Sequence, residues 1–328
     1  MRSNQGSVGR PMVEASQAVL DHYPSRNGNA SCFIDRIDPV VYVKREDAPA
    51  GMPGSSGPLN QSTIDQYERD GFVILDAVFT EHEVALFQKE MDLLRANPDI
   101  QRSDTVIREP GSDAVRSIFR VHALSALFQK LSIDNRLAGS AQQLLGDQVY
   151  IHQSRLNYKP GFRGKEFYWH SDFETWHVED GMPAMRALSM SITLTQNSAL
   201  NGPLLLVPGS HKSYLSCEGA TPENNFRTSL KQQVYGVPSD NALAQLIDAG
   251  GIVAATGKPG SVIIFDCNTM HGSNSNITPQ LRSNLFFVYN AMSNRVVAPF
   301  CDQAPRPEYI CAREDIQPIT VSGAARTR

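Results

Sequence analysis

The chain has 328 residues, of which 41% are hydrophobic and 20% charged, and its formal net charge at pH 7 is −4. This composition is typical of a globular protein with one large domain or two modest ones. No sustained basic stripe is present, so we expect no nucleic-acid partner. No stretch approaches the roughly 18 apolar residues of a membrane span. The N-terminal MRSNQGSVGRPMVEAS lacks the charged and apolar regions of a secretory signal.

The five cysteines are scattered along the chain and include no CxxC pair. They are Cys32, Cys217, Cys267, Cys301 and Cys311. An odd number of isolated cysteines argues against a disulfide framework and against a zinc site made of thiolates. We therefore expect a cytoplasmic protein, in a compartment that keeps thiols reduced.

The N-terminal part of the chain combines two kinds of sequence. Residues 1–30 are polar and mixed, which predicts a mobile or loosely docked N-terminal extension, and residues 31–328 are expected to form a single domain. Residues 47–60 concentrate proline, glycine and serine, and predict a linker or long loop within that domain.

Helices are predicted mainly in the first half of the chain. They are expected over residues 61–70, 81–95 and 125–145, with one strand over residues 71–79. Thr80 followed by Glu83 forms a capping-box pattern at the start of the second helix. Apolar residues then recur at three- and four-residue spacing, as in an amphipathic helix. Gly146 is suited to end the third helix in the left-handed conformation.

Short alternating segments, separated by glycine, proline and asparagine, follow from residue 148 onward. Strands are predicted over residues 149–159, 167–170, 188–194, 204–207, 261–266 and 284–290. Asn201-Gly202 is a strong signal for a type I′ hairpin turn. Helices first and many short strands later predict a mainly β fold, with a sandwich or barrel core and flanking helices.

His170 and Asp172 form an HxD motif at the end of a predicted strand. Because side chains alternate along a strand, both should point to the same side, as two ligands of one ion must. His271 follows the apolar run 261–265 and should lie in a loop just past a strand end, where it can supply a third ligand. Two imidazoles and one carboxylate leave coordination positions open, which is typical of Fe(II) oxygenases. A structural zinc site normally has four protein ligands.

Arg282 lies eleven residues after His271 and adds to this group. A loop and the start of the next strand span that interval, so Arg282 can return beside the metal. Its guanidinium could there hold the distal carboxylate of a keto-diacid whose other end chelates iron. An HxD pair alone can arise by chance, and an arginine alone can form a surface ion pair. The occurrence of all four residues in this arrangement is well above what chance would give.

The predicted strand 149–159 carries four long polar side chains on one face: Gln153, Arg155, Asn157 and Lys159. Burying four such side chains without partners would be expensive. Alternation alone leaves two interpretations open, a solvent-facing side or a polar-lined ligand pocket. The metal motif begins only eleven residues after Lys159, which favours the pocket.

Aromatic residues surround both parts of the predicted metal site. They are Phe167, Tyr168, Trp169, Phe173 and Trp176 near the first motif, and Phe265 and Phe286 near His271. Aromatic side chains often belong to the core. Together with arginine, they also suit a small ligand that carries a delocalised cation and a carboxylate.

Two longer segments resemble a known family. FYWHSDFETWHVEDGMPAMRALS, residues 167–189, closely resembles the signature of the ectoine hydroxylases, a branch of the phytanoyl-CoA dioxygenase-like superfamily. NGPLLLVPGSHK, residues 201–212, is typical of the wider superfamily. The resemblance extends over residues 40–313, and the first segment is the more specific of the two.

The resemblance implies a double-stranded β-helix core, also called jelly-roll or cupin-like, in an enzyme that uses Fe(II), 2-oxoglutarate and O2. Such an enzyme converts ectoine to 5-hydroxyectoine with release of succinate and CO2, a reaction of osmotic stress metabolism, and a homodimer is expected. The implied iron ligands are His170, Asp172 and His271. The implied 2-oxoglutarate contacts are Lys159, Arg282, Asn157, Phe167 and Ser273. The implied ectoine contacts are Gln153, Trp176, Arg155, Phe265, Phe286 and Arg306.

Two alternatives stay open at this point. One is a hydroxylase of the same superfamily that acts on another small zwitterion, such as an amino acid. The other is a non-catalytic jelly-roll module that binds a metal or ligand as a sensor or store. Arg282 argues against the second alternative, because storage needs no site for a co-substrate.

Overall fold

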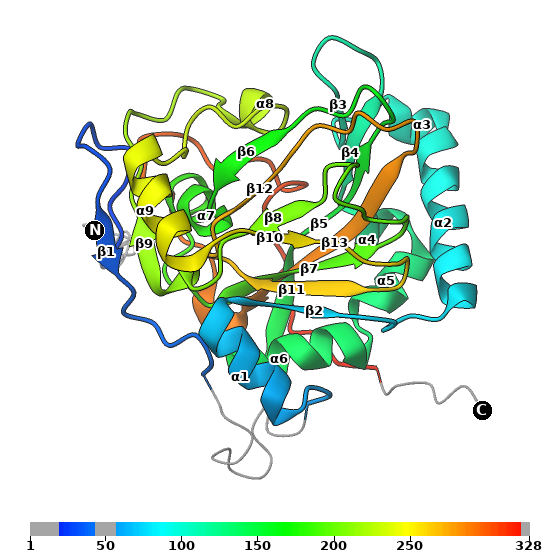
Figure 1. The fold of residues 1–328 in the computed structure, drawn as a ribbon, viewed down its shortest axis with the longest axis horizontal. Coiled ribbons are helices and arrows are strands. Elements are labelled where there is room, and N and C mark those ends of the chain that lie inside the picture. Colours follow the sequence, from blue (N-terminus) through cyan, green and yellow to red (C-terminus); the bar gives the residue numbers. More distant parts are fainter. Residues whose placement is uncertain (1–19, 43–56, 323–328) are drawn as a thin grey trace, which may run out of the picture.

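Seven strands form one antiparallel sheet, in the order β2-β11-β7-β13-β5-β4-β3, in the computed structural model of this chain (Figure 1). Their bounds are β2 (Phe72–Leu75), β11 (Val262–Asp266), β7 (Ala187–Thr193), β13 (Arg282–Ala291), β5 (Val149–Lys159), β4 (Val115–Phe119) and β3 (Val106–Arg108). The structure describes residues 20–42 and 57–322, so residues 47–56 of the predicted linker lie outside the described residues. The two longest strands, β5 and β13, pair with each other near the middle of the sheet.

A second antiparallel sheet has four strands in the order β10-β8-β12-β6. Their bounds are β10 (Val253–Ala255), β8 (Leu204–Leu206), β12 (His271–Ser273) and β6 (Phe167–His170). Phe72 and Phe265 of the large sheet share one buried apolar cluster with Leu204 and Leu206 of the small sheet. The two sheets therefore pack face to face around a common core. The predicted mainly β fold with a double-stranded β-helix core is confirmed.

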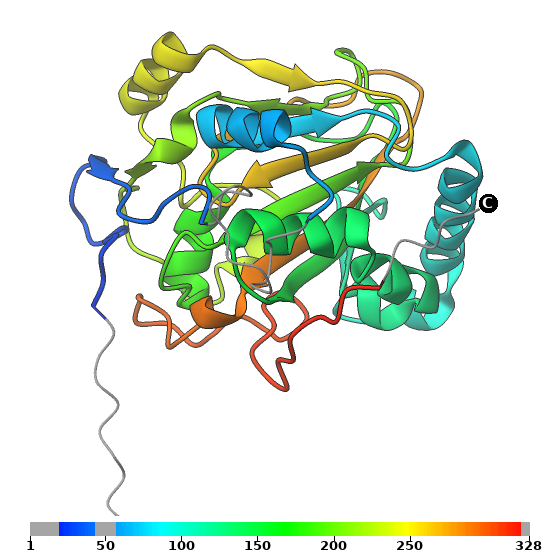
Figure 2. The same ribbon diagram turned by 90° about the horizontal axis from the view of Figure 1, so that it is seen from below.

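Helices cover the outer face of the large sheet. They are α1 (Gln61–Asp70), α2 (Glu81–Ala96), α3 (Pro98–Gln101), α4 (Val121–Leu124), α5 (Ala126–Ser132) and α6 (Ser140–Leu145). Phe87 of α2 and Leu144 of α6 belong to the same buried apolar cluster as Leu156 of β5 and Leu285 of β13. Figure 2 shows the green helix α6 against one side of the strands. The flanking helices thus bury the face of the large sheet that points away from the small one.

Most of the remaining elements lie around the small sheet, whereas the turn Met292–Asn294 directly follows β13 of the large sheet. They are α7 (Asp172–Asp180), α8 (Phe226–Ser229), α9 (Asp240–Gly250), a short ribbon of β1 (Phe33–Asp35) with β9 (Ser213–Leu215), and two 3-10 turns at Ser210–Lys212 and Met292–Asn294. Figure 1 places α7 directly after β6 and α9 beside β9. Of these, α7 begins with Asp172 of the HxD motif and therefore positions part of the predicted site.

The first two predicted helices are confirmed as α1 and α2. Thr80 caps α2, because its hydroxyl accepts the Glu83 N–H while the Glu83 carboxylate accepts the Thr80 N–H. The third predicted helix is interrupted between α5 and α6 by a π-helical turn (Asn135–Gly139). Asp134 begins this turn by accepting the Arg136 N–H. Gly146 ends α6 with a φ of 57°, as predicted.

The six strands predicted after residue 148 are all present, each with ends within two residues of the prediction. The earlier strand is shorter than predicted, because β2 stops at Leu75 before a turn in which Ala77 has a φ of 52°. The predicted hairpin at Asn201-Gly202 is wrong. The flanking strands β7 and β8 belong to different sheets, and a positive φ is found at Gly202 but not at Asn201.

The described part of the predicted N-terminal extension, residues 20–30, packs against the domain. Tyr23 is fully buried, and its ring meets the edge of Phe173 with 5.4 Å between centroids. Arg26 is 5% exposed. This segment is held because its aromatic and charged side chains have partners on α7, which its polar composition did not indicate.

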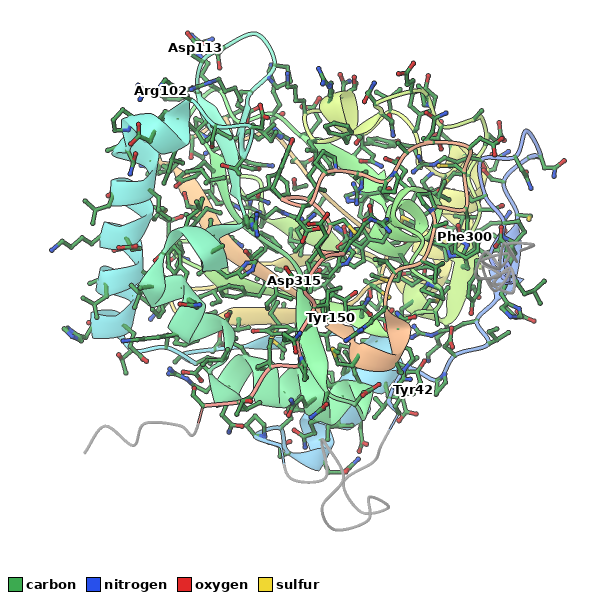
Figure 3. The ribbon with its side chains drawn as sticks, turned by 180° about the vertical axis from the view of Figure 1, so that it is seen from behind. Tyr42, Arg102, Asp113, Tyr150, Phe300 and Asp315 are labelled. Carbon is green, nitrogen blue, oxygen red and sulfur yellow. The ribbon has the colours of Figure 1, made fainter. Side chains whose placement is uncertain are left out.

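The C-terminal segment crosses the back of the domain. Figure 3 shows Asp315 beside Tyr150 of β5. The Ala312 N–H donates to the His152 carbonyl at 3.0 Å, and this path carries Arg306 into a buried position. Within the described ranges, no helix has the length and apolar character needed to cross a membrane.

Candidate active site

Two histidines and an aspartate meet where the small sheet joins α7. His170 ends β6, Asp172 begins α7, and His271 begins β12. β12 pairs with β6 so that His271 lies opposite His170. The three side chains come together as predicted, but two details of the prediction are wrong. Asp172 lies in a helix capped by Ser171, so strand alternation does not orient it, and His271 lies in a strand rather than in a loop.

The metal-binding atoms of these three residues converge. Asp172 Oδ1 lies 3.8 Å from His170 Nε2 and 3.9 Å from His271 Nε2. His170 Nδ1 lies 2.7 Å from the Tyr168 carbonyl oxygen, and His271 Nδ1 lies 2.9 Å from that of Thr269. A carbonyl only accepts, so each Nδ1 must carry the proton and each Nε2 offers a lone pair to the shared space.

The electrostatics keep these residues in the forms that bind a metal. Burial and the neighbouring His271 lower the pKa of His170 to about 3, so its ring is neutral near pH 7. Burial alone would raise the pKa of Asp172, but His271 and Arg155 lower it below its ordinary value. Ser189 donates to Asp172 Oδ2 at 3.2 Å and orients the carboxylate. Two imidazoles and one carboxylate fit a divalent iron with open coordination positions.

Lys159 and Arg282 lie side by side at one end of the site. Lys159 ends β5, Arg282 begins β13, and the two residues are paired in register. Each is 5% exposed. Lys159 Nζ donates to the Ser273 hydroxyl at 2.8 Å and to the Asn274 carbonyl at 2.5 Å, both of them neutral oxygens. Arg282 Nε has no hydrogen-bond partner among the described residues.

These two buried cations create a strong preference for an anion. Burial, together with Arg282 and Arg116, lowers the pKa of Lys159 to about 6. Burial and Arg116 likewise lower the pKa of Arg282 to about 10. Arg116 itself is paired with Glu109 at 2.8 Å. A carboxylate placed between Lys159 and Arg282 would supply the missing negative charge.

Arginine and aromatic side chains line the other end of the site. The guanidinium of Arg155 lies over the ring of Phe286, 4.8 Å from its centroid, and also contacts Gln153 Oε1. Arg306 donates to both carboxylate oxygens of Asp180, from Nε at 2.7 Å and from Nη2 at 2.5 Å. This end therefore combines positive charge with aromatic surface, as a ligand with a carboxylate and a flat ring requires.

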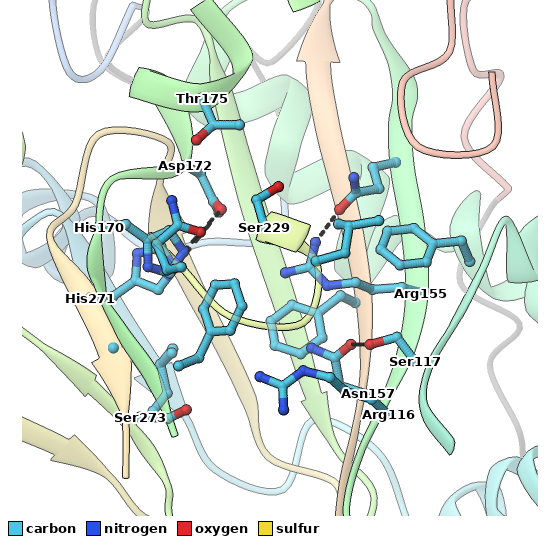
Figure 4. Close-up of a pocket in the computed structure, with 18 of the residues that line it drawn as sticks. Arg116, Ser117, Arg155, Asn157, His170, Asp172, Thr175, Ser229, His271 and Ser273 are labelled. Atoms are coloured by element: carbon cyan, nitrogen blue, oxygen red, sulfur yellow. Dashed lines mark hydrogen bonds and ion pairs between the residues drawn. The ribbon is translucent and has the colours of Figure 1, made fainter. Parts of the chain in front are cut away.

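A single pocket brings together all fourteen residues predicted to bind iron, 2-oxoglutarate or ectoine (Figure 4). They are His170, Asp172, His271, Lys159, Arg282, Asn157, Phe167, Ser273, Gln153, Trp176, Arg155, Phe265, Phe286 and Arg306. The aromatic residues Tyr168, Trp169 and Phe173 do not line this pocket. Figure 4 shows the three metal-binding residues on one side, with Arg155 and Asn157 across the pocket. The solvent-facing alternative for the polar strand is wrong, because Gln153 and Lys159 are 4% and 5% exposed.

Ten further residues line this pocket without having been predicted as site residues. They are Arg116, Ser117, Phe119, Tyr158, Thr175, Leu204, Ser229, Leu230, Gln233 and Gly272. Arg116 lies on β4, a strand of five residues that is too short to show a clear alternation. Ser229, Leu230 and Gln233 come from an irregular connection, for which periodicity gives no signal. Thr175 could have been found from its place in the signature segment, one residue before Trp176.

Comparison with known proteins gives a consistent assignment. A model of the phytanoyl-CoA dioxygenase family matches residues 67–284. The ectoine dioxygenase of Stutzerimonas stutzeri (strain A1501) is 51% identical over 301 residues, which are 92% of this chain and 97% of that protein.

Solved structures agree with this assignment. The crystal structure of EctD from S. alaskensis with 2-oxoglutarate and 5-hydroxyectoine has a TM-score of 0.82 and 48% identity, and the match covers 93% of this chain and 99% of that one. The same protein with bound Fe has a TM-score of 0.81 and 47% identity, with the same coverage. The chain belongs to the phytanoyl-CoA dioxygenase family and, within it, to the ectoine dioxygenases.

Proposed function

We propose that this chain is an iron- and 2-oxoglutarate-dependent hydroxylase that converts ectoine to 5-hydroxyectoine. One atom of O2 enters a ring C–H bond of ectoine as the hydroxyl, and the other enters succinate as 2-oxoglutarate loses CO2. The observation that carries the proposal is one pocket that joins a His/Asp/His set, a pair of buried cations and an aromatic wall with arginine. Identity of 51% with an ectoine dioxygenase over 92% of the chain supports the choice of substrate.

His170, Asp172 and His271 would hold the iron. When bound, iron activates O2 at the expense of the keto-acid, which is chemistry that no side chain supplies. The chain itself keeps the His170 Nε2 atom unprotonated and the Asp172 carboxylate charged. The backbone carbonyls that accept from each Nδ1 fix the orientation of the rings.

Lys159 and Arg282 would bind the distal carboxylate of 2-oxoglutarate. Neither of their charged groups forms an ion pair with an acidic side chain among the described residues, and Lys159 Nζ donates only to neutral oxygens. Asn157, Phe167 and Ser273 line the space between this end and the metal-binding residues. The Ser273 hydroxyl accepts from Lys159 Nζ and so steers the ammonium group toward the pocket.

The opposite end of the pocket would bind ectoine, a cyclic amidinium that carries a carboxylate. Trp176, Phe265 and Phe286 supply flat surface for the ring. Arg306 uses Nε and Nη2 to bind Asp180, so its Nη1 remains for the substrate carboxylate. Arg155 adds positive charge on this side, and the Gln153 amide, which contacts Arg155, would meet a ring N–H.

A homodimer and a cytoplasmic location also belong to this proposal. All five cysteines are free thiols, as expected in a reducing compartment. Light scattering coupled to size-exclusion chromatography should give twice the mass of the chain. A mass equal to one chain at working concentration would refute the dimer.

Turnover by the purified enzyme tests the function. The protein is loaded anaerobically with Fe(II) and 2-oxoglutarate, exposed to O2 with ectoine, and its products are separated by mass spectrometry. We expect 5-hydroxyectoine and one succinate for each hydroxylated molecule. L-Proline replaces ectoine in a parallel reaction, to test the alternative of an amino-acid hydroxylase. Absence of 5-hydroxyectoine, or faster turnover of proline, would refute the proposal.

A further inference from the structure

Arg26 is a buried arginine that joins the N-terminal segment to α7. Its Nε and Nη2 donate to the two carboxylate oxygens of Glu174 at 2.9 and 2.6 Å, and its Nη1 donates to Glu179 at 2.5 Å. The side chains of Arg26 and Glu174 are each 1% exposed. The Arg26 backbone has a φ of 53°, a left-handed conformation that costs energy for a residue with a Cβ. The surrounding contacts must therefore hold this residue firmly in place.

The helix that Arg26 contacts also forms one wall of the pocket. Asp172 begins α7, and Thr175 and Trp176 line the pocket from its first turns. Arg26 Nη2 donates to Thr175 Oγ1 at 3.2 Å. Arg26 therefore contacts directly a side chain that lines the pocket.

The connection between β9 and α9 attaches to the same ion pairs at two points. Asn225 Nδ2 donates to Glu179 Oε1 at 2.7 Å. Gly236 packs so closely that a Cβ atom there would lie 2.4 Å from Glu174 Oε2 and 2.5 Å from Arg26 Nη2. We call residues 221–236 the pocket segment, because the part between these two attachments reaches the pocket.

Three side chains of the pocket segment, Ser229, Leu230 and Gln233, line the pocket. Figure 4 shows Ser229 near Asp172, on the same side as Thr175. Lys159 and Arg282 belong to β5 and β13, at the end of the pocket assigned to the co-substrate. The pocket segment and α7 thus form the wall that faces the substrate.

We propose that Arg26 is a positioning residue for substrate binding, which fixes α7 and the pocket segment against each other. Its guanidinium is the only positive charge hydrogen-bonded to Glu174 and Glu179 among the residues that the structure describes. Removing it would leave two buried carboxylates in mutual repulsion, with the pocket segment attached to one of them. The inference rests on the proposed function for the identity of the substrate.

The variant Arg26→Ala tests this role through the two Michaelis constants. We expect the KM for ectoine to rise about tenfold or more while the KM for 2-oxoglutarate changes less than about twofold. Arg26→Lys should recover part of the loss, because an ammonium keeps the charge but not the forked geometry.

Arg36→Ala is the matched control. Arg36 comes from the same N-terminal segment and forms a buried ion pair with Asp266 at 2.9 Å, and its hydrogen bonds reach neither α7 nor the pocket segment. This variant should lower the melting temperature and leave both Michaelis constants unchanged. Equal changes in both constants for Arg26→Ala, or the same pattern in Arg36→Ala, would overturn the proposal.

Hydrogen–deuterium exchange gives a readout that does not depend on turnover. In Arg26→Ala, amides of residues 221–236 should exchange faster than in the unmodified protein, whereas Arg36→Ala should not change them. Asn225→Ala removes only the attachment to Glu179, and should show a smaller change in the same direction even where Arg26→Ala fails to fold. Unchanged exchange in the pocket segment would refute the role of Arg26. If the protein does not hydroxylate ectoine, the proposed function is refuted instead. The exchange result would still test whether Arg26 positions the pocket segment.

Discussion

Lys159 offers a direct test of the co-substrate end of the pocket, because its charge depends on pH near neutrality. Burial, with Arg282 and Arg116 close by, lowers its pKa to about 6 in the free protein. A bound dicarboxylate places negative charge next to the ammonium group and raises that pKa again. The protonated form therefore binds the dicarboxylate better, and binding takes up a proton.

The size of the effect follows from the fraction of Lys159 that is protonated. With a pKa of about 6, this fraction falls from about a quarter at pH 6.5 to about a hundredth at pH 8. The Kd for 2-oxoglutarate should thus rise about 25-fold over this interval. His170 has a pKa of about 3 and Arg282 has a pKa of about 10, so neither side chain changes its charge between pH 6.5 and pH 8.

Isothermal titration calorimetry on Mn(II)-loaded protein measures this Kd without turnover. Titrations in buffers of different ionisation enthalpy should show uptake of close to one proton at pH 8. Lys159→Met keeps most of the side-chain volume, and should bind more weakly with a Kd that no longer changes with pH. A Kd that is equal at pH 6.5 and pH 8, or a pH dependence that persists in Lys159→Met, would show the reasoning to be incorrect.

Three further predictions concern the metal site, the co-substrate and the fold. His170→Ala and Asp172→Ala should each abolish hydroxylation with an unchanged circular dichroism spectrum. Near-normal turnover in either variant would contradict its assignment as an iron ligand. Arg282→Ala should raise the KM for 2-oxoglutarate about 10- to 100-fold and that for ectoine far less, because it loses charge-assisted hydrogen bonds; equal effects in a kinetic assay would contradict this. Thr80→Ala removes the cap of α2 and should lower the free energy of unfolding by about 1 kcal/mol in urea titrations. No loss would mean that the capping box does not stabilise α2.

The strand that carries the polar residues could be predicted because its pattern is long. β5 runs over eleven residues, so its alternation places Gln153, Arg155, Asn157 and Lys159 on one face before any partner strand is known. β12 has three residues and gave no such signal. It is a strand because β6 and β8 pair with it on both sides, which the local sequence does not encode.

Contacts between distant parts of the chain account for what could not be predicted. Arg26 reads as one polar residue among others, but its partners Glu174 and Glu179 lie about 150 positions later in the chain. Polar composition predicted an extension, whereas three carboxylate hydrogen bonds hold this segment against α7. Ser229 and Gln233 likewise reach the pocket from a connection without periodicity. In both cases the residues that determine the position of the segment lie elsewhere in the chain, so the sequence of the segment alone does not predict it.

The three-residue HxD motif proved part of a longer arrangement, since α7 carries functional groups at intervals of four residues. Asp172, Trp176 and Asp180 lie on one face of the helix, spread over about 12 Å along its axis. They supply a metal ligand, an aromatic surface and the carboxylate that holds Arg306. One rigid element therefore sets the distance between the iron-binding end and the arginine assigned to the substrate carboxylate.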